Sequence, residues 1–172
     1  MRHRMVLVGS SVCDVVRTAG GCIFDRVSAG WDVLVLVADH PDTRALEILG
    51  ARVLDLDTAY ANVSEPFPQA LAVCSDLIAS DERVRREILD VLGGGYEKEG
   101  GGMDVTVWGE SCPDELKDRF APDEHRLSMA ARVFKAQALA AAGCAVDTVA
   151  PTEAFRVDLL RPPGRSLLVS AS

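Results

Sequence analysis

The stretch Val6-Leu7-Val8-Gly9-Ser10-Ser11-Val12-Cys13-Asp14 decides the fold. Its apolar run ends at a glycine, and a helical pattern with apolar residues at helical spacing follows. A strand that turns into a helix at glycine is typical of α/β folds, in which ligands bind at such turns. The sequence therefore predicts a strand over 5–8 and a helix over 14–29, with Asp14 as the N-cap and Gly30 just past the end.

Apolar runs and helical stretches continue to alternate downstream, which favours a parallel sheet covered by helices. Residues 32–37 are nearly all apolar, as in a central strand buried on both faces. A short helix over 43–49 that ends at Gly50, and a strand over 52–56, complete a β-α-β-α-β unit. We expect one three-layer α/β/α domain over 1–172, Rossmann-like, with a mostly parallel sheet of about five strands.

The second half of the chain is predicted in less detail. A loop over 60–68 leads into a long helical region over 69–92, with a break near Ser80, and then into a flexible glycine-rich loop over 93–102. A strand over 104–108 and a helix over 127–142, closed by Gly143, follow. Segments 146–149 and 155–160 are expected to be edge strands, and 162–172 a loosely ordered tail.

Composition excludes several classes of protein. The net charge of −8 repels nucleic acid and anionic membrane surfaces. No apolar run approaches the ~20 residues needed to span a bilayer, and no signal peptide is evident, so we expect a cytoplasmic protein. The five cysteines are odd in number and form no C-x-x-C pair, so we expect reduced thiols. The dinucleotide fingerprint G-x-G-x-x-G is absent.

The turn over 9–14 is followed by a glycine pair, Gly20-Gly21, and late in the chain by the motifs Lys135-Ala136-Gln137-Ala138 and Glu153-Ala154-Phe155. Together these motifs resemble those of the LmbE/PIG-L family of zinc-dependent N-acetylglucosamine deacetylases. Residues 9–14 stand where that family has Gly-Ala-His-Pro-Asp-Asp, and Gly20-Gly21 stands where it has a glycine pair. Residues 28–38 and 44–56 follow the order of the family's next elements. Lys135-Ala136-Gln137-Ala138 and Glu153-Ala154-Phe155 are similar to its terminal Lys-x-x-Ala helix and Glu-Ala-Phe ending.

The resemblance implies a zinc site with three protein ligands and one open position. Matched residue by residue, Ser11 stands at the position of the ligand histidine and Cys13 at that of the general-base aspartate, while Asp14 keeps the ligand aspartate. The second ligand histidine belongs to a His-x-x-His motif, which this sequence lacks. The leading hypothesis is therefore a catalytically degenerate relative without zinc, a pseudoenzyme that binds a small molecule or a partner protein.

The turn after the first strand carries the candidate site residues. Cys13 and Asp14 are the candidate catalytic groups, because a cysteine near a helix N-terminus has a lowered pKa; the alternative for Cys13 is a small buried thiol. Backbone N–H groups and hydroxyls at this turn are suited to holding an anionic group of a ligand. The predicted ligand-binding residues are Ser10, Ser11, Asp14, Asp39 and His40.

Two alternative functions stay open. Asp14, Asp39, His40 and His125 form a candidate rebuilt metal site, which would make the protein a zinc-dependent hydrolase of the deacetylase type. Against it, Asp39 to Asp42 fits a turn in which Asp42 or Thr43 caps the next helix, and His125 fits a solvent-facing residue at a helix start. The other alternative is an interaction module that forms homo-oligomers.

Overall fold

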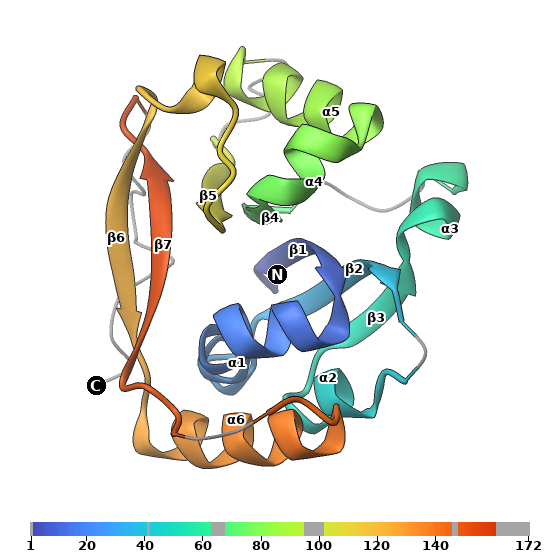
Figure 1. The fold of residues 1–172 in the computed structure, drawn as a ribbon, viewed down its shortest axis with the longest axis vertical. Coiled ribbons are helices and arrows are strands. Elements are labelled where there is room, and N and C mark those ends of the chain that lie inside the picture. Colours follow the sequence, from blue (N-terminus) through green and yellow to red (C-terminus); the bar gives the residue numbers. More distant parts are fainter. Residues whose placement is uncertain (1, 41, 63–67, 95–101, 146–147, 161–172) are drawn as a thin grey trace.

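The computed structural model describes residues 2–40, 42–62, 68–94, 102–145 and 148–160. Within these residues the chain forms one seven-stranded sheet with the order β3-β2-β1-β4-β5-β7-β6 (Figure 1). The strands are β1 (Arg4–Ser11), β2 (Asp32–Asp39), β3 (Arg52–Asp55), β4 (Ala70–Cys74), β5 (Asp104–Trp108), β6 (Phe120–Arg126) and β7 (Thr152–Asp158). The five strands from β3 to β5 are parallel, and β7 is antiparallel to both β5 and β6. The predicted mostly parallel α/β fold is confirmed, with seven strands in place of five.

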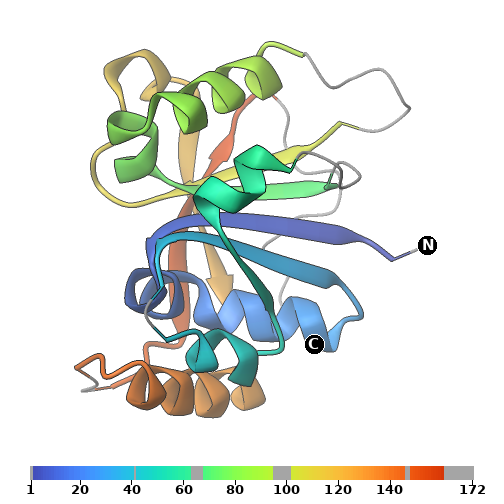
Figure 2. The ribbon, with the colours of Figure 1, turned by 90° about the vertical axis from the view of Figure 1, so that its right-hand side faces the viewer.

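Helices cover both faces of the sheet (Figure 2). One face carries α1 (Val12–Ser28), α2 (Arg44–Ile48) and α6 (Met129–Ala141). The other carries α3 (Leu56–Ala61), α4 (Ser75–Ser80) and α5 (Glu82–Leu92). In the described part of the chain, no helix combines the length and the hydropathy needed to cross a membrane.

The first strand and helix differ from the prediction at their junction. Strand β1 continues to Ser11, and α1 begins at Val12. Ser11 is the N-cap in place of Asp14, because its hydroxyl accepts a hydrogen bond from the Asp14 backbone N–H at 3.1 Å. This junction places Asp14 in the first turn of the helix.

The prediction of one helical region over 69–92 was wrong at its start. Ala70–Cys74 is strand β4, which lies between β1 and β5 and is buried at every position. A short run that is apolar on all sides fits a central strand as well as a buried helix, and only the neighbouring strands decide between them. The break near Ser80 is confirmed, since α4 ends there and Asp81 caps α5.

The C-terminal strands also differ from the prediction. Strand β6 was missed, because its sequence contains a proline and four charged or titratable side chains. Strand β7 lies between β5 and β6 and not at an edge, and residues 148–150 are not in a strand. Most of the predicted glycine-rich loop, residues 146–147 and the predicted tail over 162–172 lie outside the described residues.

Candidate functional site

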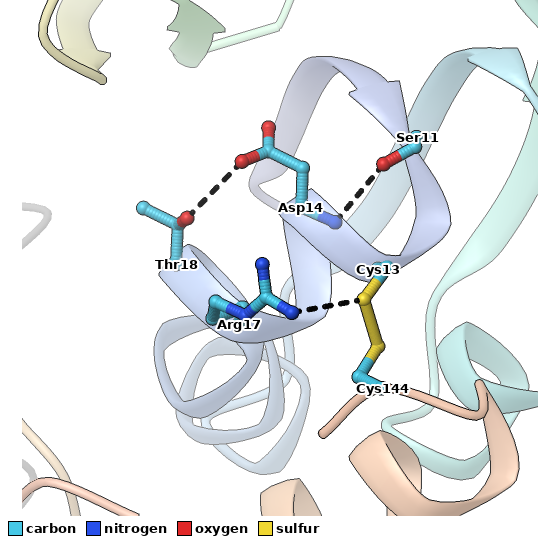
Figure 3. The surroundings of a disulfide bond; sticks show 6 residues. All are labelled: Ser11, Cys13, Asp14, Arg17, Thr18 and Cys144. Atoms are coloured by element: carbon cyan, nitrogen blue, oxygen red, sulfur yellow. Dashed lines mark hydrogen bonds between the residues drawn. A yellow bond between two sulfur atoms is a disulfide. The ribbon is translucent and has the colours of Figure 1, made fainter. Parts of the chain in front are cut away.

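The Asp14 carboxylate lies at the carboxyl end of the parallel sheet and turns toward β5. Its Oδ2 accepts a hydrogen bond from the indole Nε1–H of Trp108 at 3.2 Å, and its Oδ1 accepts one from the Thr18 hydroxyl at 3.5 Å. Figure 3 shows that the Ser11 hydroxyl lies at the N-terminus of the same helix turn. Both oxygens of Asp14 therefore already have a donor, and the Ser11 hydroxyl is used as a helix cap.

Cys13, one residue earlier, is joined to Cys144 by a disulfide bond (Figure 3). The prediction that all the cysteines are reduced thiols was wrong for this pair, whose Cα atoms lie 6.0 Å apart. A spacing of 131 residues gave no sign of the bridge, which exists because α6 brings residue 144 back against the start of α1. Cys22, Cys74 and Cys112 are free and buried.

Asp39 and His40 lie at the end of β2, beside the Asp14 turn. Ser11 pairs with Asp39 in the register of β1 and β2, as expected for parallel neighbours. The His40 ring, however, bonds the Asp55 carboxylate at the end of β3, with 2.7 Å between Nε2 and Oδ1. This hydrogen bond raises the pKa of His40, while the Thr58 backbone N–H and then His40 lower the pKa of Asp55. His40 is thus paired away from Asp14.

The turn after β2 behaves as a helix start. The Asp42 carboxylate accepts a hydrogen bond from the Arg44 backbone N–H at 3.0 Å. Thr43 occupies the N-cap position, but its side chain makes no capping bond. Of the two predicted caps, it is Asp42 whose side chain bonds the first turn.

His125 lies on β6 and is 1% exposed, so the prediction of a solvent-facing helix residue was wrong. Its Nε2 bonds the buried carboxylate of Asp25 at 2.8 Å. The same carboxylate accepts hydrogen bonds from the backbone N–H and the hydroxyl of Ser128, at 3.1 and 2.5 Å. Asp25 therefore joins α1, β6 and the start of α6, and His125 belongs to this buried network.

These residues do not fit the catalytic zinc site that the resemblance implies. A catalytic zinc needs three protein ligands with free lone pairs around an open position. At this turn the Cys13 sulfur is in a disulfide, and Ser11, which stands at the position of the ligand histidine, uses its hydroxyl to cap the helix. Across the described ranges, no three histidine, cysteine, aspartate or glutamate side chains converge in a way that could hold a metal ion.

The other motifs of the resemblance meet in one buried cluster. The Lys135 ammonium donates to the Glu153 carboxylate and to the Arg17 carbonyl, each at 2.6 Å. Glu153 also accepts the backbone N–H groups of Gly21 and Cys22, at 2.8 and 2.7 Å. In a regular helix the Arg17 carbonyl would accept a hydrogen bond from the Gly21 N–H. Here Lys135 bonds that carbonyl and Glu153 bonds that N–H, so two side chains from outside α1 satisfy these backbone groups.

The cluster depends on close packing and on burial. A Cβ atom on Gly21 would lie 2.3 Å from the Leu127 side chain, so the second glycine of the pair permits this contact. Burial raises the pKa of Glu153, and the Lys135 ammonium opposes the rise. The motifs that contain Gly21, Lys135 and Glu153 therefore join α1, α6 and β7. The sequence revealed each motif but not that the three meet in one cluster.

A pocket of about 720 Å³ opens beside Asp14, between the start of α1, the end of β5 and the β6–β7 pair. Trp108 and Thr18, the two donors to Asp14, both line it. The remaining lining residues are Val107, Gly109, Glu110, Pro122, Asp123, Glu124, Ala154, Phe155 and Arg156. None of the predicted ligand residues is among those that line this pocket: Ser10, Ser11, Asp14, Asp39 and His40.

Gly109 gives the pocket its turn after β5. Its φ of +102° is strained for any residue with a side chain, and a Cβ atom there would lie 2.5 Å from the Ser75 hydroxyl. Ser75 is fully buried, and its hydroxyl makes no hydrogen bond within the described structure. The chain can therefore leave β5 in this direction only at a glycine.

A scan of family models and a search of curated proteins found no match to this chain. Solved structures do match. The A40926 pseudoaglycone deacetylase Dbv21 superposes with a TM-score of 0.55 at 17% identity over 81% of each chain. A deacetylase in complex with teicoplanin gives 0.58 at 13% identity, over 90% of this chain and 97% of that one. GalB, the 4-carboxy-2-hydroxymuconate hydratase of Pseudomonas putida KT2440, gives 0.60 at 12% identity, over 95% and 99%.

At such identities the comparison establishes the fold. The chain has the same fold as these deacetylases, so the fold that the motif resemblance implied is confirmed. Because a hydratase has the same fold, the scaffold alone does not select a reaction.

Proposed function

We propose that this chain uses a deacetylase-type scaffold to bind a small molecule without hydrolysing it. The observation that carries the proposal is the state of the turn after β1. There Cys13 is bridged to Cys144, and both oxygens of Asp14 accept hydrogen bonds from the protein. Neither a free general base at position 13 nor a set of three metal ligands supports hydrolysis at this turn.

The pocket beside Asp14 is the binding site in this proposal. Trp108 and Phe155 supply aromatic walls, and Glu110, Asp123 and Glu124 supply carboxylates that accept hydrogen bonds from hydroxyl or ammonium groups. This combination suits a hydroxylated amine. The motif resemblance to N-acetylglucosamine deacetylases supports an amino sugar as this ligand.

Titration of the full chain with glucosamine, followed by amide chemical shifts, tests this function. We expect binding with a Kd of about 1 mM or tighter, which corresponds to about 4 kcal/mol. The shifts should centre on β5, β6 and β7, and N-acetylglucosamine incubated with the protein should release no acetate.

Glu124→Gln should weaken the binding about threefold, because an exposed ion pair contributes at most about 1 kcal/mol. Asp90→Asn removes a carboxylate from the exposed face of α5 and is the matched control, with no change expected. Absence of glucosamine binding, or equal effects of the two variants, contradicts the assigned ligand. Release of acetate contradicts the non-catalytic role.

A second candidate is self-association of two copies through α6. Its outer face exposes the large apolar side chains of Met129 (76%), Val133 (55%) and Phe134 (38%). Light scattering after size-exclusion chromatography should then give a dimer that Val133→Glu converts to a monomer. A monomer in the unmodified protein removes this candidate.

A further inference from the structure

The Cys13–Cys144 bridge joins two helix ends of opposite polarity. Cys13 lies in the first turn of the 17-residue helix α1, where the N–H groups give the positive end of the helix dipole. Cys144 follows the C-terminus of α6, which is the negative end of that helix dipole. The two sulfurs are therefore placed in unequal electrostatic surroundings.

The end of α6 is built so that Cys144 reaches Cys13. Gly143 adopts a φ of +71° and its N–H donates to the Ala140 carbonyl at 3.1 Å. The Cys144 N–H then donates to the Leu139 carbonyl at 3.0 Å, which fixes the residue past the helix end. Both bridged cysteines are partly exposed, so small reagents can reach their sulfurs.

A cation stands beside only one of the two sulfurs in the described contacts. The Arg17 guanidinium, one turn further along α1, donates to the Cys13 sulfur at 3.4 Å (Figure 3). A helix N-terminus and a neighbouring arginine both stabilise a thiolate, which is the reactive form of cysteine. By contrast, burial raises the pKa of Cys22 to about 12 and raises that of Cys74.

We propose that Cys13 and Cys144 form a reversible redox pair, in which Cys13 is the thiol that reacts with peroxides and Cys144 is the resolving thiol. The Cys13 thiolate attacks one oxygen of the peroxide, the O–O bond breaks, and a sulfenic acid and a hydroxide or alkoxide form. The Cys144 sulfur then attacks the sulfenic sulfur, a water molecule leaves with the thiol proton, and the S–S bond forms. A dithiol reverses the change and is itself oxidised to a disulfide.

The fold does not depend on the bridge alone to hold α1 against α6. Lys135 on α6 bonds the Arg17 carbonyl of α1, and Asp25 on α1 bonds Ser128 at the start of α6; neither contact involves the sulfurs. We therefore expect a folded protein in both redox states. The oxidised state ties the turn that carries Asp14 to the end of α6.

The test compares single-cysteine variants of the full chain. After reduction, hydrogen peroxide should remove two hydrogen atoms from the intact protein, as measured by mass spectrometry, with Cys13 and Cys144 found in the linked peptide. In Cys144→Ser, dimedone present during oxidation should label Cys13 as a sulfenic acid. In Cys13→Ser, Cys144 should remain unlabelled under the same conditions.

Arg17→Gln should slow the oxidation of Cys13 about fivefold or more near neutral pH, because it removes the cation beside the thiolate. Arg86→Gln, on the exposed face of α5, is the matched control and should leave the rate unchanged. Failure of peroxide to form the bridge, equal labelling of the two cysteines, or a bridge that resists excess dithiothreitol in the native protein overturns the proposal. The last result would make the bridge a permanent structural bond.

Discussion

Replacing Lys135 by methionine tests the buried cluster that joins α1, α6 and β7. Methionine keeps the length of the side chain but removes the ammonium from Glu153 and from the Arg17 carbonyl. Removing one partner of a buried ion pair costs about 3–5 kcal/mol. A domain has only about 5–15 kcal/mol of stability in total. We expect urea unfolding to show a loss of this size and the Tm to fall by on the order of 10 °C.

The loss of unfolding free energy in Lys135→Met should also depend on pH, and the direction of this dependence follows from the pKa of Glu153. Burial raises the pKa of this carboxyl, and Lys135→Met removes the ammonium that opposes the rise. The folded variant then retains a proton at pH values where the unfolded chain has lost it. Stability falls as pH rises above the unfolded value of about 4.3, so the destabilisation should be larger at about pH 8 than at about pH 5.

Lys117→Met is the matched control, since Lys117 forms an exposed ion pair with Asp114 whose side chains are 57% and 93% exposed. Its effect should stay below about 0.5 kcal/mol. The two variants are compared at the same redox state of the Cys13–Cys144 bridge. Equal small losses in the two variants would refute the structural role of the cluster.

Two further predictions concern the turns that follow strands β2 and β5. Gly109→Ala should lower the free energy of unfolding by about 1–3 kcal/mol more than Gly30→Ala. Both glycines have a positive φ, but only Gly109 has a neighbour within 4 Å of an added Cβ atom; equal losses in thermal unfolding would contradict the clash. The pKa of His40, followed by NMR, should lie above its usual value and fall in Asp55→Asn, whereas an unchanged pKa would remove Asp55 as its cause. Because the folded pKa is raised, the stabilisation from this contact is present below about pH 6.5 and is lost as pH rises through the folded pKa.

The first third of the fold could be predicted from the sequence because its signals are local. Residues 32–37 have the apolar pattern of a buried strand, and Gly30 and Gly50 follow helix ends with positive φ. The helix over 127–142 was found for the same reason, with Gly143 after its end. In these segments the spacing of apolar residues and the helix stops agree with the tertiary structure.

The segments that were missed depend on their neighbours in space. Ala70–Cys74 is compatible with a helix until β1 and β5 are placed on either side of it. Phe120–Arg126 has little β-propensity and becomes a strand because β7 pairs with it over its whole length. His125 was predicted to face solvent because strand β6 was missed. Its burial depends on its contact with Asp25 of α1, which the local sequence does not show.

The predicted site residues lie at the carboxyl ends of the parallel strands, but most of their contacts could not be predicted. Ser11 pairs with Asp39 in the sheet, whereas His40 bonds Asp55 and the partners of Asp14 are Thr18 and Trp108. The indole donor is 94 residues away in the sequence, so no spacing pattern could reveal it. The same holds for the Cys13–Cys144 bridge.

The zinc content of the oxidised full chain tests the central claim most directly. The protein is incubated with zinc, separated from free metal by gel filtration, and measured by inductively coupled plasma mass spectrometry. We expect far less than one zinc ion per chain, and the same value in Asp14→Ala. One zinc ion per chain that is lost in Asp14→Ala would show that the turn after β1 still holds a catalytic metal and would contradict the account.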